Sequence, residues 1–369
     1  MAIKRYNGTT GQWEFVGHPG SITPAAIGAV PTSGSSTITG NLTVSSLNSG
    51  QLAGFRNVLI NGAMDIWQRG APTTASPTAI GAASAYTADR WNVYRAGLVT
   101  GASWSMQSTP AELPADFRYA LRVQRVASNT STATIVCAQH METQNAWALR
   151  GKTVSFSFYA RAGANYSPTF SALTVQLITG TGTDESARAG MTNQTTALNS
   201  TATLTTSWQR FTYTTTLSNV MTSLSALVFS TPVGTAGADD WFEVTGLQLE
   251  ISPVATPFEF LPIGTELSLC QRYYHRLTGG EISGNYYTST NLYPAVPHPV
   301  EMRVAAVLTA SSQSAVTAYS NGAGRASTSI TQNFSTTRIF GMAVVTSAAT
   351  AGHGASIGVG GVLEFSAEI

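Results

Sequence analysis

Charged side chains are scarce in this sequence. Only 10% of its 369 residues are Asp, Glu, Lys or Arg, against about 25% in ordinary globular proteins. Hydroxyl and amide groups must therefore cover much of the surface. The formal net charge of +1 excludes the strongly basic surface that favours binding to nucleic acid or to an anionic membrane.

Cysteine and long apolar runs are scarce too. Cys137 and Cys270 stand alone, without CxxC spacing or a nearby His pair, so we predict two buried thiols and neither a disulfide nor a zinc site. No stretch approaches the ~20 apolar residues of a membrane helix, and MAIKRYNGTT lacks the apolar core of a signal peptide. We therefore expect synthesis in the cytoplasm and no membrane insertion.

Catalytic motifs are missing as well. The sequence has no GxSxG elbow, Walker loop or HExxH motif. Its acids are few, and the adjacent pairs Asp184-Glu185 and Asp239-Asp240 are typical of turns and not of the two facing carboxylates of a glycosidase. The sequence therefore predicts a protein that is not an enzyme, with no catalytic residues.

A two-residue alternation dominates what is present. In TVSFSFYARA, Phe156 and Phe158 fall on one face of a strand, and Ser155 and Ser157 fall on the other. The alternation recurs at 119–123, 173–177, 211–213 and 247–251. Clusters of Gly, Pro, Asn and Ser, which favour turns, separate these runs. We predict an all-β chain whose central part, residues 57–262, is an antiparallel β-sandwich.

The stretch GTELSLCQRYYHRL breaks this pattern. After a Thr265 cap, its apolar residues recur at helical intervals. These residues are Leu267, Cys270, Tyr274 and Leu277. We therefore predict a short helix and linker over residues 263–279 and, beyond it, a separate small β domain over 280–369. Strand candidates in that domain are 304–308, 338–343 and the segment VLEFSAEI.

The sequence KRYNGTTGQWEFV predicts a β-hairpin within residues 1–20. One strand precedes the Asn7-Gly8 turn, and Trp13 and Phe15 share a face of the next strand. An isolated hairpin is only marginally stable in water. We therefore expect this hairpin to dock on another protein.

The segment 21–56 has no charged residue before Arg56. Ile38, Leu42 and Val44 lie on one face of an extended strand there. Such a segment has too little apolar surface to fold alone and too much to stay solvated. We predict an extended shaft in which several copies of the chain wind around one axis.

Five segments in this order resemble a module of bacteriophage tail fibre proteins: NVLINGAMDIWQRG, YTADRW, GLQLE, ATPFEF and GTELSLCQRYYHRL. The module is itself similar to jelly-roll carbohydrate-binding modules, and the resemblance covers residues 57–277. AIKRYNGTTGQWEFVG and ITGNLTV resemble phage fibre shafts. The resemblance implies a homotrimeric virion fibre or spike that is made in the host cytoplasm. Its N-terminal hairpin would dock on other tail or baseplate proteins, and it would attach to a glycan on the host surface.

Two interpretations of NVLINGAMDIWQRG and YTADRW stay open. In the structural one, Trp67 and Trp91 fill the sandwich, and Asp89 makes a fixed polar contact with Arg90 or Arg69. The core residues of the strand that begins the sandwich would then be Ile60, Met64 and Ile66. In the functional one, the two tryptophans stack on sugar rings. We favour the structural interpretation, because the motif recurs as a framework signature of the module, whereas ligands usually contact loops or an exposed sheet face.

A structural calcium ion is a further implication of the resemblance. Related jelly rolls hold Ca²⁺ between an acid near the start of the module and an Asp in the penultimate strand. Asp65 and Asp240 match these places, and backbone carbonyls would have to supply most of the six to eight oxygen ligands. The alternative is a pair of solvated turn acids.

The segment EISGNYYTSTNLYPAVPHP concentrates aromatic rings among small polar residues and prolines. Such a composition suits recognition of glycans or proteins. The receptor candidates here are Tyr286, Tyr287, Tyr293 and His298. In the alternative, these rings pack against the sandwich or another subunit. Second-choice stacking residues in the sandwich are Trp104, Trp147 and Tyr159.

Two functions of different class follow. The preferred one is an adhesion fibre that binds a host-surface glycan. The other is a purely structural virion component, such as a head fibre, collar or decoration protein. Exposure of the C-terminal tyrosines discriminates between them, because open rings favour recognition and buried rings favour scaffolding.

Overall fold

The computed structural model describes residues 4–7, 9, 12–15, 54–81 and 84–369. The chain divides into two units, Met1–Asn48 and Ser49–Ile369. In the first unit, β1 (Lys4–Asn7) pairs antiparallel with β2 (Gln12–Phe15), which confirms the predicted hairpin. Gly8 of its predicted turn lies outside the described residues. So does the predicted shaft up to residue 53, with Ile38, Leu42 and Val44.

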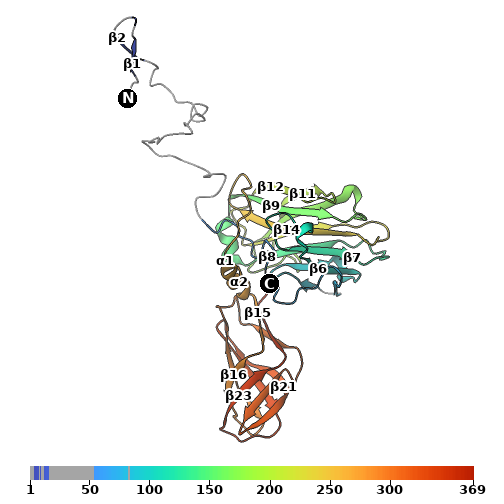
Figure 1. Ribbon diagram of the computed structural model, residues 1–369, viewed down its shortest axis with the longest axis vertical. Helices are drawn as coiled ribbons and strands as arrows, with labels where there is room; N and C mark the ends of the chain where they lie inside the picture. The colour runs from blue at the N-terminus through green and yellow to red at the C-terminus, as the bar shows by residue number, and fades with distance from the viewer. Residues whose placement is uncertain (1–3, 8, 10–11, 16–53, 82–83) are drawn as a thin grey trace. The chain divides into compact units, whose positions relative to one another are not determined.

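The second unit begins with a β-sandwich, as predicted (Figure 1). Among the described residues, each of its sheets has six antiparallel strands. The first sheet runs in the order β11 (Thr195–Thr203), β10 (Ala172–Gly180), β13 (Ser223–Ser230), β8 (Ile135–Met141), β5 (Asn92–Arg95) and β4 (Ala85–Tyr86). The second runs in the order β12 (Gln209–Thr216), β9 (Thr153–Ala162), β14 (Trp241–Glu250), β7 (Ala120–Arg125), β6 (Ala102–Gln107) and β3 (Thr78–Ile80).

Strand β9 shows how far the alternation predicted burial. Phe156 and Phe158 lie in the core, as their spacing predicted. Ser155 and Ser157, however, are buried as well. Ser155 donates to the backbone oxygen of Ser252, and Ser157 accepts a hydrogen bond from Arg210. Because these neighbours cover the second face of β9, the strand is buried on both faces and not on one.

Short helices connect the strands. The longest in the described residues, α2 (Ile263–Gln271), follows Pro262, and Thr265 lies inside its first turn without capping it. The others are α1 (Thr143–Ala146) and the 3-10 turns η2 (Ala96–Leu98), η3 (Pro110–Glu112), η4 (Trp147–Leu149) and η5 (Thr169–Ser171).

The predicted helix is too long by its last two apolar positions. Tyr274 and Leu277 belong to strand β15 (Tyr274–Thr278), which pairs with β24 (Val362–Ser366). Pairing with a strand some 90 positions away in the sequence has overridden helical spacing, as tertiary contacts often override local preference. The C-terminal domain therefore begins at the residues that were predicted to be its linker.

The C-terminal domain consists of two further antiparallel sheets, drawn in orange and red in Figure 1. The smaller sheet runs in the order β15, β24 and β19 (Val307–Ala310). The larger runs in the order β16 (Glu281–Asn285), β23 (Gly354–Val359), β20 (Val316–Ser320), β21 (Ala323–Ser335), β22 (Ile339–Thr346) and β17 (Asn291–Leu292), and β18 (Ala295–Pro297) also pairs with β22. All three strand candidates thus overlap observed strands.

Candidate functional site

The tryptophans of the motif formed by NVLINGAMDIWQRG and YTADRW belong to the architecture. Trp91 is fully buried in the sandwich core, where its indole N–H donates to the Asn61 oxygen at 2.9 Å. Trp67 stacks on Trp104, with ring centroids 6.0 Å apart. Trp67 is half-buried and packs against the same core that encloses Trp91, so the structural interpretation is confirmed.

One detail of that interpretation is wrong. Ile60, Met64 and Ile66 are buried, but they lie in a turn and not in a strand. The turn is fixed by Asn61, whose side chain donates to the backbone oxygens of Ile66 and Asp89 at 2.9 and 3.0 Å. A buried amide that satisfies several backbone groups stabilises a turn that alternation alone does not reveal.

The two arginines of the motif hold the C-terminal segment. Glu368 accepts hydrogen bonds from Arg69, at 3.0 Å, and from Arg90. Arg69 stacks on the ring of Tyr274 at 3.5 Å, and Arg90 stacks on Tyr273 at 3.6 Å. The motif therefore joins the sandwich to the domain that follows it, and Figure 1 shows the C-terminus beside α2.

Asp89 completes this junction. Its carboxylate accepts hydrogen bonds from the backbone and side chain of Gln68 and lies 3.9 Å from Arg69. Arg69 is thus the partner of Asp89, while Arg90 pairs with Glu368. Burial raises the pKa of Asp89 to about 6, against the lowering effect of Arg69.

The sandwich candidates offer little open aromatic surface. Trp104 is buried, so its prediction as a stacking residue is wrong: β6 directs its ring into the core. The half-buried ring of Tyr159 packs against Phe117 at 5.1 Å. Trp147 is 55% exposed, but the guanidinium of Arg150 lies 4.0 Å from its ring centre.

Charges occupy the outward face of the second sheet. Glu243 of β14 is fully buried and accepts hydrogen bonds from Arg122 and Arg161, each at 2.7 Å. Arg122 also lies 4.0 Å from the ring centre of Trp241. These pairs satisfy buried charges, which would otherwise be costly, and they cover an aromatic ring that a ligand would need.

Two of the four C-terminal candidates are buried. Tyr286 is in the domain core, where its hydroxyl lies 2.9 Å from the Thr346 hydroxyl oxygen. His298 is buried beside His275, with ring nitrogens 2.7 Å apart. Their prediction as receptor contacts is wrong: Tyr286 bridges Leu292 of β17, His298 follows β18, and the pairing of both strands with β22 turns these rings inward.

Tyr287 and Tyr293, in contrast, are 77% and 39% exposed. Their ring centroids lie 5.7 Å apart, edge to face. The backbone fixes both residues: Tyr287 donates its N–H to Asn291 at 2.9 Å, and Tyr293 donates to Asn285. The pair is therefore a positioned aromatic platform on the surface.

Sequence reasoning missed a further open tyrosine, Tyr319, which is 51% exposed. In the run VTAYS, Val316 and Ala318 point into the core, so alternation places Tyr319 outward. That signal was available, but the run is short and the surrounding residues are small. The tyrosine-rich segment has the stronger composition signal.

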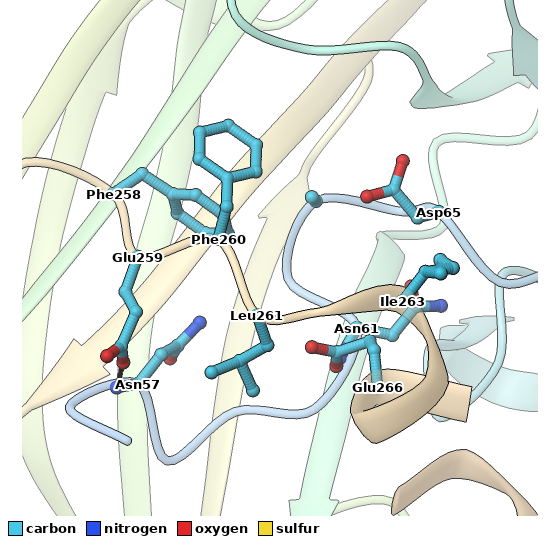
Figure 2. A pocket seen from close by; sticks show the side chains of 10 residues that line it. Asn57, Asn61, Asp65, Phe258, Glu259, Phe260, Leu261, Ile263 and Glu266 are labelled. Carbon is cyan, nitrogen blue, oxygen red and sulfur yellow. Dashed lines mark hydrogen bonds between the residues drawn. The ribbon is translucent and has the colours of Figure 1, made fainter. Parts of the chain in front are cut away.

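A small cavity beside Asp65 tests the calcium prediction. Figure 2 shows Asp65, Glu266 and Asn61 around it, with Glu259 bonded to Asn57. The cavity of about 20 Å³ has room for one water molecule, which excludes a sugar ring. Burial raises the pKa of Asp65 and of Glu266, and Glu266 accepts a hydrogen bond from the Asn61 backbone N–H.

Asp240, the second predicted calcium ligand, does not line that cavity. It pairs with the buried Arg125 at 3.1 Å and accepts a hydrogen bond from the backbone of Ser167 at 3.0 Å. Arg125 also donates to the backbone oxygens of Asn129 and Gly234. A guanidinium therefore already neutralises this carboxylate. The described residues bring no three His, Cys, Asp or Glu side chains into a metal-binding group, and calcium at Asp65 stays a prediction.

No protein-family model matches the chain, and no curated protein matches its sequence significantly. Among solved structures, a xylan-binding domain of the CBM22 type from Paenibacillus barcinonensis is 13% identical, covers 54% of this chain and 96% of that one, and has a TM-score of 0.30. The module TmCBM61, solved with β-1,4-galactotriose, is 12% identical, covers 53% and 99%, and has a TM-score of 0.31.

A third similar structure is the enzymatically active domain of tailspike protein 4 of bacteriophage CBA120. It is 9% identical and covers 56% of this chain and 23% of that one, with a TM-score of 0.31. All three TM-scores lie below 0.5, so the function of this chain must be inferred from its own residues. In the described part of the chain, no helix is long and apolar enough to cross a membrane.

Proposed function

We propose that this chain is a virion fibre or spike protein, without catalytic activity, that attaches a phage to glycans on its host. The observation that carries the proposal is the exposed pair Tyr287 and Tyr293. The sequence segments that resemble phage fibre proteins, and their order along the chain, add support to the proposal.

The geometry of the pair suits a sugar. A pyranose has an apolar C–H face that packs on an aromatic ring, and hydroxyls at its edge that need polar partners. Two rings set edge to face form an angular platform, and Thr288, Thr290 and Asn291 lie in the loop between them. Tyrosine also loses little conformational entropy on binding, because it has only two side-chain torsions.

Assembly would make a weak site useful. We propose a homotrimer held by the uncharged segment 21–56, docked on tail or baseplate proteins by the N-terminal hairpin. Three shallow sites on one fibre raise the effective concentration of the second and third contacts. Native mass spectrometry of the full chain should give three times 38.7 kDa, and a monomeric mass would contradict this assembly.

Point variants test the site. Purified full-length protein should block phage adsorption to a panel of candidate hosts, and Tyr287→Ala/Tyr293→Ala should block at least about tenfold less well, the equivalent of 1.4 kcal/mol. Trp147→Ala is the matched control, because it removes an exposed aromatic ring from the sandwich. Equal blocking by the double variant would refute the proposed site.

The alternative is a structural virion component. The burial of Tyr286 and His298 favours it, because half of the predicted receptor residues serve the domain core. Failure of the unaltered protein to bind any host cell or glycan would make this alternative the better account.

A further inference from the structure

We propose that the outward face of the larger C-terminal sheet carries a groove that is a second saccharide site. In this groove, Tyr319 stacks on a neutral pyranose, and Glu281 accepts hydrogen bonds from the hydroxyls of the sugar. The inference takes the ligand class from the proposed function but uses a different set of residues. It therefore stands or falls separately from Tyr287 and Tyr293.

The groove has a volume of about 420 Å³, large enough to hold a sugar ring. The strand register builds it: Gly358 of β23 lies opposite both Glu281 of β16 and Thr317 of β20. In the next row on the same face, Ser356 lies opposite Tyr319. The complete lining is Gly280, Glu281, Thr317, Tyr319, Gly358, Val359 and Gly360.

Two glycines leave room on the sheet for the ring of Tyr319. A Cβ atom at Gly324 would lie 2.9 Å from one edge of the ring, and one at Gly358 would lie 3.2 Å from the other edge. The ring can therefore lie across both strands only because these positions have no side chain. The ring is nevertheless 51% exposed and lines the groove.

Glu281 supplies the polar edge of the groove. Its carboxylate accepts a hydrogen bond from the Ser356 hydroxyl at 2.7 Å, which fixes its position. Among the described residues, this bond engages only one of its two oxygens. A positioned carboxylate beside an aromatic face provides both an acceptor for sugar hydroxyls and a surface for sugar C–H groups.

The charge of the groove selects the class of sugar. Its lining contains one carboxylate and no Lys, Arg or His. An acidic sugar would bring a second negative charge next to Glu281 with no cation to offset it. We therefore infer a neutral hexopyranose as the ligand and expect acidic sugars to be rejected.

Saturation-transfer NMR on the full-length protein tests the groove. The probes are methyl β-D-glucopyranoside, methyl β-D-galactopyranoside and N-acetylneuraminic acid. We expect saturation transfer to the C–H protons of at least one neutral glycoside and at least fivefold less to the acidic sugar. Stronger transfer to the acidic sugar, or none to either glycoside, would overturn the proposal.

Three variants separate this site from the tyrosine pair. Tyr319→Ala should weaken binding of the neutral glycoside at least about tenfold. Glu281→Gln should weaken this binding less, and it should also reduce discrimination against the acidic sugar. Gly360→Val should also weaken this binding, because residue 360 lines the groove and its Cβ would meet no other atom within 4 Å. In contrast, the Tyr287→Ala/Tyr293→Ala variant should retain binding of the neutral glycoside. Unchanged binding by Tyr319→Ala would refute the groove, even if the tyrosine pair proves to be an adhesion site.

Discussion

The sandwich and the C-terminal domain place their aromatic residues differently. In the sandwich, Trp91 and Trp104 are buried and Arg122 lies over the ring of Trp241, whereas Trp147 and Phe170 stay 55% and 88% exposed. In the C-terminal domain, several tyrosine rings lie open on a surface of Gly, Ser and Thr. The comparison teaches that aromatic content alone does not mark a binding face. What matters is whether the other side of the strand is already covered.

Among the described residues, every buried acidic residue lies in the sandwich, although other acids there, such as Asp116 and Asp239, are exposed. Buried ion pairs in the sandwich and at its junction use up the carboxylates of Glu243, Asp240 and Glu368. Glu281 of the C-terminal domain, however, is exposed beside an open groove. Under the proposed function, the sandwich would be a frame and the C-terminal domain would be the surface that contacts the host.

The largest expected effect comes from breaking the frame. Trp91→Ala removes a fully buried indole and one of the two hydrogen-bond donors to the Asn61 backbone oxygen, the other being the Met64 N–H. We expect a loss of about 3–5 kcal/mol in the free energy of unfolding, from the cavity and the lost hydrogen bond. Urea denaturation measures it. A loss below about 1 kcal/mol would mean that the motif does not organise the core.

Next comes the junction. Glu368→Ala leaves the buried guanidinium of Arg90 without its carboxylate, and one unpaired buried charge costs about 3 kcal/mol. The C-terminal domain should become easier to cleave by protease near α2. Glu301→Ala is the matched control, since its pair with Arg338 is exposed to solvent and contributes little to stability. Equal effects of both variants would contradict the junction.

A smaller effect should appear with pH. Burial, with a further contribution from His298, lowers the pKa of His275 to about 4 from its usual 6.5. Between pH 6.5 and pH 4, His275 is therefore protonated in the unfolded chain and neutral in the folded chain. The stability contributed by neutral His275 is complete above pH 6.5 and is lost as the pH falls toward 4.

His275→Gln should remove this dependence, which amounts to about 2 kcal/mol after allowance for screening. The groups of the sandwich, such as Asp89, stay in both proteins and cancel in the comparison. Unfolding free energies at pH 7, 5.5 and 4.5 provide the measurement. Parallel pH curves for the two proteins would show that the histidine pair does not titrate in this way.

The smallest effect on stability is expected where we expect the largest effect on binding. Tyr287→Ala removes a ring that is 77% exposed, so the free energy of unfolding should change by less than about 0.5 kcal/mol. Thermal unfolding of this variant should overlay that of the unaltered protein. A clear loss of stability would assign Tyr287 to structure and weaken the division between frame and surface.

The sequence predicts the strands of this protein better than its contacts. Alternation of apolar and polar residues located β9, β22 and β24, because two-residue periodicity is a local property. The bond between Arg90 and Glu368 joins residues 278 positions apart, and no local pattern reveals it. The motif was therefore correctly interpreted as architecture, while its role in holding the C-terminal segment needed the structure.

The candidate site was predictable in part for the same reason. Tyr286 and Tyr287 are adjacent in a tyrosine-rich segment. Because neighbouring side chains of an extended chain point to opposite faces, the sequence predicts one inward ring and one outward ring. Which of the two points inward depends on the register of the sheet. Helical spacing of Tyr274 and Leu277 likewise failed, because a distant strand pairs with them. Tyr319 was missed although alternation placed it outward.

The most direct test of the division between frame and surface is a glycan array probed with three full-length proteins: unaltered, Trp147→Ala, and Tyr287→Ala/Tyr293→Ala/Tyr319→Ala. We predict that the unaltered protein and Trp147→Ala bind the same glycans with equal intensity and that the triple variant, folded to the same unfolding midpoint, binds none. Retained binding by the triple variant would show that the glycan site does not use these tyrosines, and loss of binding in Trp147→Ala would place the site on the sandwich. Either result would contradict this account.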